Sequence, residues 1–457
     1  MMVRTYSKPW TRRRFIKAGA MTAAFMAIGG CAKNPVTGRS QLMFVSETDE
    51  ITMDRQAAPH QLSADYGRTQ DGELNAYVSE VGQRLAGVSH RPEMPYNFQV
   101  VNATYVNAYA FPGGTIACTR GIMLDMESEA ELAGLLGHEI AHVNARHTAS
   151  RMSTSILVSL AAGVGGALIG AKYGGEMGAL AGGLGAFGAG MLLASYSRAD
   201  ERQADSLGME YMTRAEYNPD GMAGLMEALN ALHDKEPSAL EVMFATHPMS
   251  SERLATARAE ANTKYLSARE YSMYRERYMD NTAALRAKAP AIKDLQTAEK
   301  HLIKKEYTKA DEHIASALAK APDDYVGLLL MAKSKAAQGR YNEGIPYAER
   351  AREAYPAEPQ ALQLNGLLLV RNGNFAQALT NFAAYETALP GNPYSAFYKG
   401  YCKEGMGDRR GAASEYVRFL EQVNQGDQAK HAYYRLVEWG YVQGMAEPVS
   451  NPFRGLA

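Results

Sequence analysis

Cysteine is scarce in this sequence, with three residues in 457. Three cysteines are too few for the disulfide framework that holds small secreted domains together. Cys118 and Cys402 lie in different predicted domains, so we expect both to be free and buried, whereas Cys31 follows an N-terminal apolar stretch. The chain must therefore be stabilised by hydrophobic cores, and its length suffices for about three domains.

The sequence also lacks an excess of charge of either sign. Lys and Arg number 48 against 49 Asp and Glu, which gives a net charge of −1. No basic stripe runs along the chain, so nucleic acid is not an expected partner. Two uncharged Gly- and Ala-rich runs, 156–171 and 177–194, approach but do not clearly reach the roughly 20 residues of a transmembrane helix.

One short motif carries most of the chemical information, H-E-x-x-H at residues 138–142. The segment 131–148 is predicted to be helical, because apolar residues recur at steps of three and four: Leu132, Leu135, Leu136, Ile140 and Val143. His138 and His142 then lie one turn apart on one face, where two imidazoles can hold one Zn²⁺. Glu139 lies about 100° round the helix and can reach a water at the metal. The alternative, two solvated or otherwise satisfied histidines, is disfavoured by the apolar flanks.

A third ligand must come from elsewhere. His147 is nine residues after His138, about 180° round a continuous helix, so it is predicted to face away. Downstream, Glu201 and Asp205 are four residues apart and share a helical face. Glu201 is predicted to complete a His-His-Glu site with one position open. Asp205 is predicted to accept the second N–H of a ligand histidine.

These motifs together resemble a known family. H-E-x-x-H, then S-R-x-x-E-x-x-A-D from Ser197, then His247-Pro248 with Arg253, resembles the gluzincin metallopeptidases that include HtpX and the CAAX prenyl proteases. The similarity is greatest to the periplasmic, TPR-bearing BepA-like (YfgC-like) branch, and residues 107–114 resemble that family's strand beside the active site. The resemblance implies a zinc endopeptidase, with one zinc ion per chain, that degrades misfolded or misassembled outer-membrane proteins.

His247 and Arg253 are the candidates for further catalytic residues. Peptide hydrolysis needs a donor for the oxyanion of the tetrahedral intermediate, and either side chain could provide it. His247 could instead occupy the open metal position in a latent resting form. A purely structural role beside a helix cap is the remaining alternative for His247.

A small sheet is expected next to the motif helix. Residues 98–105 and 108–122 predict a hairpin or short sheet with its turn at 112–114. An exposed strand edge near the metal could pair with the backbone of a substrate, although an ordinary core strand is the alternative. The candidates for this edge are Asn107, Ala108 and Tyr109.

Helices are predicted on either side of this sheet and motif. Residues 46–88 are expected to be helical, with Ser46 and Thr48 as candidate caps. The Gly- and Ala-rich segment 156–194 is predicted to form an antiparallel helical hairpin, which would return the chain so that Glu201 meets the two histidines. Contact of this hairpin with a membrane is the alternative.

The first 30 residues are predicted to be an export signal. T-R-R-R-F-I-K from Thr11 resembles a twin-arginine signal, with ordinary Sec export as the alternative. The apolar stretch 18–30 ends in a sequence resembling a bacterial lipobox, so Cys31 is predicted to be lipidated and 31–45 to be a tether. Because Ala32 is not Asp, we expect an outer-membrane lipoprotein facing the periplasm; a soluble periplasmic protein is the alternative.

From residue 291 the chain repeats itself every 34 residues. The repeated positions hold small residues, aromatic residues and a terminal proline: Tyr307, Tyr341 and Phe375; Ala310, Gly344, Ala378 and Ala412; Gly339, Gly373 and Gly407; Gly366 and Gly400; and Pro322, Pro356 and Pro390. This period is typical of tetratricopeptide repeats, which bind peptides or proteins on a concave face. Four repeats over 291–424 and a capping helix over 427–442 are predicted.

The sequence thus predicts a mainly α protein. An α+β zinc peptidase domain (46–263) with a small sheet beside the H-E-x-x-H helix is joined by a helical connector (264–290) to an all-α TPR domain (291–445) and a tail (446–457). The TPR domain is expected to recruit unfolded envelope proteins or the outer-membrane assembly machinery. The alternative function is a TPR scaffold or chaperone with latent proteolysis, although an intact Glu139 argues against a dead enzyme.

Overall fold

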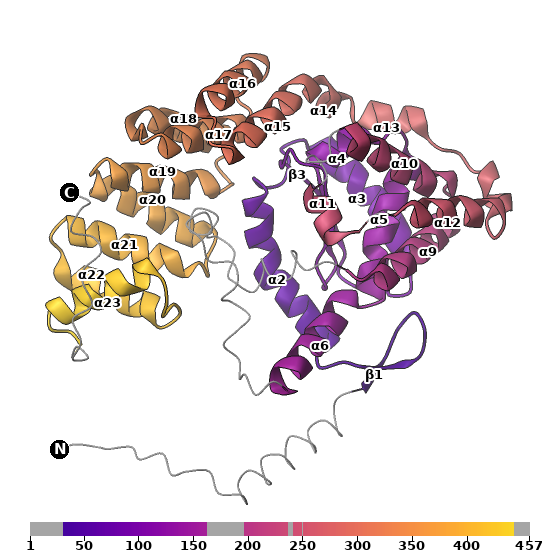
Figure 1. The fold of residues 1–457 in the computed structure, drawn as a ribbon, viewed down its shortest axis with the longest axis horizontal. Coiled ribbons are helices and arrows are strands. Elements are labelled where there is room, and N and C mark those ends of the chain that lie inside the picture. Colours follow the sequence, from indigo (N-terminus) through magenta and orange to yellow (C-terminus); the bar gives the residue numbers. More distant parts are fainter. Residues whose placement is uncertain (1–30, 162–195, 236–240, 249, 443–457) are drawn as a thin grey trace, which may run out of the picture.

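The computed structural model describes residues 31–161, 196–235, 241–248 and 250–442 (Figure 1). The predicted export signal, the tail and all of the predicted Gly- and Ala-rich hairpin beyond Ala161 lie outside the described residues. The predicted fold class is confirmed: a mostly helical first part contains a small sheet and is followed by helix pairs only. Within the described ranges, no helix is long and apolar enough to cross a membrane.

The central sheet has three strands, β3 (Asn97–Val101), β4 (Ala108–Ala110) and β5 (Thr115–Thr119), in the order β3-β5-β4. β4 and β5 form the predicted hairpin, whereas β3 runs parallel to β5. Both predicted strand segments were too long at their C-terminal ends. The second stops at Thr119 because its hydroxyl caps helix α4 (Arg120–Asp125), accepting from the backbone N–H of Ile122.

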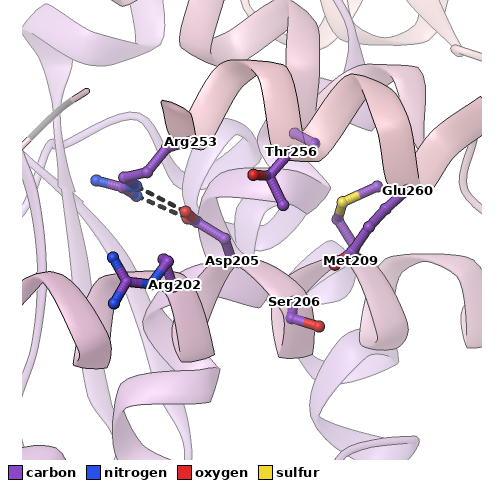
Figure 2. Close-up of a pocket in the computed structure, with 8 residues that line it drawn as sticks. Arg202, Asp205, Ser206, Met209, Arg253, Thr256 and Glu260 are labelled. Atoms are coloured by element: carbon purple, nitrogen blue, oxygen red, sulfur yellow. Dashed lines mark hydrogen bonds and ion pairs between the residues drawn. The ribbon is translucent and has the colours of Figure 1, made fainter. Parts of the chain in front are cut away.

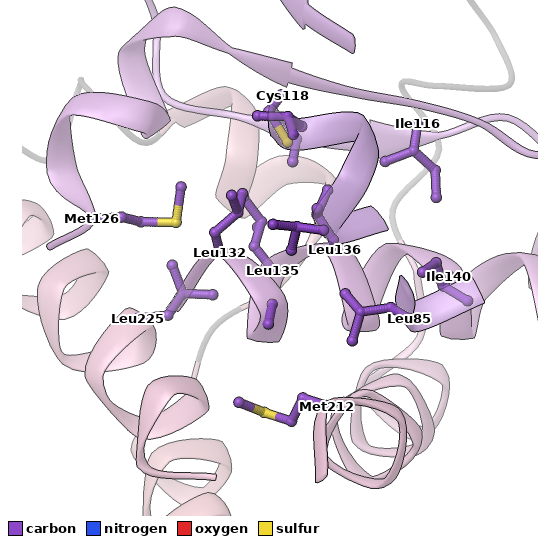
Figure 3. Close-up of a cluster of buried hydrophobic side chains, with 14 of the residues drawn as sticks. Leu85, Ile116, Cys118, Met126, Leu132, Leu135, Leu136, Ile140, Met212 and Leu225 are labelled. Carbon is purple, nitrogen blue, oxygen red and sulfur yellow. The ribbon is translucent and has the colours of Figure 1, made fainter. Parts of the chain in front are cut away.

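The two faces of this sheet pack against different parts of the molecule. Ala108 and Cys118 belong to a core that includes helix α5 (Glu129–Asn144). Figure 3 shows the leucines of α5 next to Ile116 and Cys118. The opposite face carries Tyr109 and Phe111, which belong to a second core shared with the C-terminal helices. The sheet is therefore a layer common to both halves of the protein.

The N-terminal helical segment is divided in two. α2 (Glu47–Ala64) and α3 (Gly72–Gly87) are separated by a turn in which Tyr66 and Gly67 have φ of 66° and 74°. Ser46 caps α2 in a capping box with Asp49, as expected, and Thr48 lies inside the helix. The left-handed conformations of Tyr66 and Gly67 redirect the chain, so residues 46–88 do not form a single helix.

The segment 31–45 is folded, so its description as a tether was wrong. β1 (Cys31–Lys33) and β2 (Ser40–Leu42) form an antiparallel pair. The backbone N–H of Phe44 donates to the Ser153 hydroxyl at 2.9 Å, which attaches the segment to helix α6 (His147–Ala161). Met43 and Val45 are buried in a small core with Ala149.

Four further helices belong to the N-terminal part: α9 (Arg198–Arg214), α10 (Asp220–Lys235), α11 (Glu241–Thr246) and α12 (Ser251–Asn262). The predicted connector is helical, with η2 (Leu266–Glu270), α13 (Arg275–Asn281) and α14 (Ala283–Ala287). The connector is not a free spacer, because Tyr278 is fully buried and its hydroxyl donates to the Met123 carbonyl at 2.7 Å.

The C-terminal part consists of four antiparallel helix pairs and a final helix, which form a curved row in Figure 1. Gly366 and Gly400 let the helices of a pair touch, since a Cβ there would lie 2.8 Å from the Phe382 ring and 2.7 Å from the Tyr416 ring. The pairs are α15 (Ala289–Ile303) with α16 (Tyr307–Lys320), α17 (Tyr325–Ala337) with α18 (Tyr341–Ala354), α19 (Gln360–Arg371) with α20 (Phe375–Ala388), and α21 (Pro393–Gly405) with α22 (Arg409–Leu420), followed by α23 (Asp427–Glu438).

The first three helix pairs are joined to the N-terminal part by a seam of polar contacts that are buried or half-buried. Arg120 and Asp324 form a bidentate pair at 2.7 and 3.2 Å. The Gln360 amide donates to the Ser63 carbonyl at 3.1 Å. Together with the apolar core that both parts share, these contacts attach the C-terminal helices to the sheet face that carries Tyr109.

Candidate metal centre

Helix α5 carries the two histidines of H-E-x-x-H into the interior. His138 and His142 are 6% and 2% exposed, and their Nε2 atoms lie 3.0 Å apart. α5 and α9 approach closely at Gly137 and Gly208, where a Cβ on Gly208 would lie 2.9 Å from the backbone nitrogen of His138. Glycine at this crossing allows the carboxylates of α9 to reach the histidines.

Four residues supply possible ligand atoms within 4.8 Å of one another: His138, His142, Glu201 and His247. The Glu201 carboxylate lies 3.4 Å from His142 Nε2 and 3.6 Å from His138 Nε2. His247 points its Nδ1 at Glu201, at 3.1 Å, and lies just after α11. The structure therefore brings together the three predicted ligands and the downstream histidine.

The residues present fit a metal ion. Three imidazole nitrogens and a carboxylate are a donor set that divalent transition metals accept. Glu139 lies beside them, and its Oε2 is buried with no hydrogen-bond partner among the residues that the structure describes. A buried polar atom without a partner is costly unless something else satisfies it. Burial raises the pKa of Glu139, which favours its ability to receive a proton, while the nearby His247 and His138 oppose that rise.

Asp205 and Arg253 form a layer behind the candidate ligands. Asp205 lies 3.0 Å from His138 Nδ1, the contact that the sequence predicted. Arg253 donates to both oxygens of Asp205 at 2.6 Å, as Figure 2 shows, and its Nη1 lies 2.7 Å from Glu201. Burial alone would raise the pKa of Asp205. The hydrogen bonds from Arg253 and His138 outweigh this effect, so the pKa is lowered.

This arrangement changes the expectation for Arg253. The guanidinium is 6% exposed and is engaged by two carboxylates of α9. It is therefore better placed to hold Glu201 and Asp205 than to donate to the oxyanion of a substrate.

The prediction that His147 faces away was wrong. α5 ends at Asn144, and Arg146 takes φ of 58° before α6 begins at His147. The reversal returns His147 to His142, with their Nδ1 atoms 2.9 Å apart. The 180° estimate assumed one continuous helix, and a left-handed arginine is not readable from sequence.

Sequence reasoning also missed Tyr196. Its ring stacks on His142 with centroids 3.8 Å apart and an interplanar angle of 27°. Its backbone N–H donates to the carbonyl of Thr246 at 3.0 Å, next to His247. The sequence signal for Tyr196 was its position one residue before Ser197, which is the N-cap of α9, the helix of Glu201 and Asp205.

The predicted substrate strand lies at an edge, but its side chains are covered. β4 is the outer strand of the three, next to β5. Asn107, Ala108 and Tyr109 are 4%, 1% and 6% exposed. The Tyr109 hydroxyl donates to Asp65, and the side-chain oxygen of Asn107 is buried without a hydrogen-bond partner. Pairing of this strand with a substrate stays a prediction.

The three cysteines divide as the sequence suggested. Cys118 and Cys402 are free and buried, which confirms that expectation. Cys31 is the first residue of β1 and of the described chain. Its lipidation stays a prediction.

The sequence of this chain is similar to those of known peptidases. Residues 73–261 match the family described as Peptidase family M48. The beta-barrel assembly-enhancing protease of Escherichia coli K12 is 31% identical over 195 residues, which are 41% of this chain and 39% of that protein. Its namesake from Yersinia pestis is 29% identical over 209 residues, also 41% of this chain and 39% of that protein. Metalloprotease YcaL of Escherichia coli K12 is 30% identical over 187 residues, 38% of this chain and 68% of that protein. The chain thus spans well under half the length of the first two relatives.

Proposed function

Because the chain belongs to peptidase family M48, we propose that it is a zinc-dependent endopeptidase. The observation that carries this proposal is the convergence of His138, His142 and Glu201 beside a buried carboxylate oxygen of Glu139 that lacks a partner. Nitrogen and carboxylate ligands in this number suit zinc.

Each residue of the site has its own role in the proposed peptide hydrolysis. Zinc in this site would supply a Lewis acid that lowers the pKa of a water molecule and polarises the substrate carbonyl. Glu139 takes a proton from the attacking water and delivers it to the leaving amine. Asp205 orients His138, and Arg253 holds Asp205 and Glu201 in place. The buried surroundings exclude bulk water and strengthen each of these interactions.

His247 has a distinct proposed role. Its Nδ1 is 3.4 Å from His138 Nε2 and 3.1 Å from Glu201, within the same group of potential ligand atoms. With His247 as a fourth protein ligand, the position needed for water would be filled and the enzyme would be latent. Moving the loop that follows α11 would then free this position and leave His247 available to the oxyanion.

The proposed substrates are unfolded or misassembled proteins of the bacterial envelope. The name of the assembly-enhancing relatives supports this, as does the predicted lipid anchor at Cys31. The TPR helices would recruit a substrate or the outer-membrane assembly machinery, and β4 would pair with the substrate backbone. The TPR scaffold or chaperone remains a second candidate, favoured by the possible fourth protein ligand.

The test compares the mature wild-type chain with Glu139→Gln for zinc content and for cleavage of casein or an unfolded porin. We expect one zinc per chain in both proteins and a cleavage rate lower by roughly 10²–10⁴ in the variant. Glu131→Gln is the matched control, because Glu131 is a buried glutamate on the same helix that lies outside the ligand group.

The other outcomes separate the candidates. Zinc in both proteins and cleavage in neither would favour latency, and His247→Ala should then restore cleavage. If both His247→Ala and His247→Gln, which keeps a donor for the oxyanion, fail to cleave, the scaffold is favoured. Absence of zinc from both proteins would remove the proposed peptidase.

A further inference from the structure

The two histidines of the motif have different partners behind them. His138 Nδ1 faces the carboxylate of Asp205, which Arg253 holds in turn. His142 Nδ1 lies 2.9 Å from the imidazole of His147, and within the described part of the chain no carboxylate contacts it. On the far side of that imidazole, His147 Nε2 lies 3.1 Å from the amide oxygen of Gln203. One ligand candidate is thus backed by a charged group, and the other by a second imidazole.

The chain holds His147 in this place by a dedicated turn. Arg146 has φ of 58°, which is uncommon for a residue with a side chain. Its guanidinium donates to Glu50 at 2.8 Å and to the Val45 carbonyl at 2.8 Å, so contacts with the N-terminal segment fix the reversal. His147 itself is 4% exposed. The position of this side chain is therefore set from two sides.

A metal ion bound by His142 would fix the direction of each donor. His142 Nε2 faces His138 Nε2 and Glu201, the side where the metal would bind, and it must be free of hydrogen to act as a ligand. The proton of a neutral His142 then resides on Nδ1 and is donated to His147 Nδ1. His147 in turn carries its proton on Nε2 and donates it to Gln203.

We propose that His147 is a positioning residue for the metal site: it accepts the Nδ1–H of His142, with Gln203 behind it, and so aims His142 Nε2 at the metal. This inference rests on the proposed zinc site. Groups of this kind fix the tautomer and the ring orientation of a ligand histidine. The Asp200 carboxylate lies 3.6 Å from His147 Nε2, but the group in direct contact with His142 is an imidazole. It should polarise His142 less than Asp205 polarises His138, which makes the two ligands inequivalent.

The test measures zinc affinity by competition with a chromophoric chelator and the ligand field of bound Co²⁺ by its visible spectrum. His147→Leu removes the acceptor, and we expect zinc affinity to fall about 10–100-fold. His147→Asn keeps an acceptor oxygen near the position of Nδ1, so it should retain most of the affinity. His90→Leu is the control: it also removes a histidine that has a side-chain partner, Tyr211 at 2.7 Å, although His90 is half-buried.

The outcomes distinguish this inference from the proposed function. Zinc binding that is lost in His138→Ala but unchanged in a folded His147→Leu overturns the inference alone. Equal losses of affinity in the Leu and Asn variants, with equal drops in thermal midpoint, would make His147 merely structural and also overturn it. Absence of zinc binding by the wild type overturns the proposed function and this inference together. Retained affinity in Asn, a loss in Leu and an altered Co²⁺ spectrum in Leu support it.

Discussion

The metal centre and the seam between the two domains both bury charged groups, but they arrange them differently. In the seam, the groups meet in pairs: Arg120 binds Asp324, and Glu358 binds the Ser63 hydroxyl. In the metal centre, four potential ligands point at one common region, and an oxygen of Glu139 has no partner. Paired groups satisfy each other and hold two surfaces together. Converging groups satisfy each other incompletely, so they can bind something else.

Breaking the Arg120–Asp324 pair of the seam should have the largest effect of the changes in this comparison. Asp324→Asn keeps the N-cap of α17, because asparagine also accepts from the backbone N–H of Gly327, but it leaves Arg120 buried without its counter-ion. Loss of one partner of a buried pair typically costs about 3–5 kcal/mol. We expect a marked fall in the urea midpoint of unfolding, with zinc affinity unchanged.

The matched control is Asp408→Asn at the exposed N-cap of α22, where the carboxylate accepts from Gly411 at 2.9 Å. It should change the unfolding midpoint very little. If Asp324→Asn lowered zinc affinity as strongly as it lowered stability, the two regions would not be independent and the comparison would fail.

Glu358 is the weak point of the seam because it has no cationic partner among the contacts that hold it. Burial raises its pKa from 4.5 to about 7, although hydrogen bonds from Ser63 and the backbone of Gln360 oppose the rise. The folded state therefore binds the proton more tightly than the unfolded state, and stability should decrease as pH rises from 4.5 to 7, by up to about 3 kcal/mol. Glu358→Gln should remove this slope and be more stable than the wild type at pH 8.

Unfolding free energies across this pH range provide the measurement. Glu353→Gln, at an exposed position near the end of α18, is the control and should keep the wild-type slope. A wild-type slope that persists in Glu358→Gln would show that another group is responsible.

Substitution of Asp205 should have the smallest effect of these changes, and it tests the metal centre. Asp205→Asn weakens the acceptor of His138 and the anchor of Arg253, so zinc affinity should fall about 10–100-fold, or about 1.4–2.7 kcal/mol. Chelator competition measures this directly. Glu210→Gln, on the same helix and paired with Arg214, is the control. Unchanged affinity in Asp205→Asn would contradict its assignment behind His138.

The features that were predictable from sequence depend on local spacing. His138 and His142 are four residues apart, so helix geometry places them on one face. The glycines of the 34-residue repeat predict where paired helices touch. The structure brings Glu201, Asp205 and His247 to these histidines, as the sequence indicated. Their binding of zinc stays a prediction.

The features that were not predictable depend on contacts between distant segments. The turn at Arg146 is held by Glu50, almost a hundred residues earlier, so the return of His147 leaves no local pattern. The parallel pairing of β3 with β5 and the docking of 31–45 on α6 have the same origin. The seam residues look like ordinary surface charges in sequence, because nothing local indicates that Asp324 faces Arg120.

The shared sheet has a practical consequence for anyone dividing this chain into fragments. Tyr109 and Phe111 share one core with Ala57 and Ala58 of α2 and with Leu329 and Leu330 of α17. Dividing the chain would split this core, so an isolated peptidase fragment and an isolated TPR fragment would each expose part of it. Exposed apolar faces of this kind promote aggregation. Either fragment would need polar substitutions on that face before its behaviour in solution reported on the intact protein.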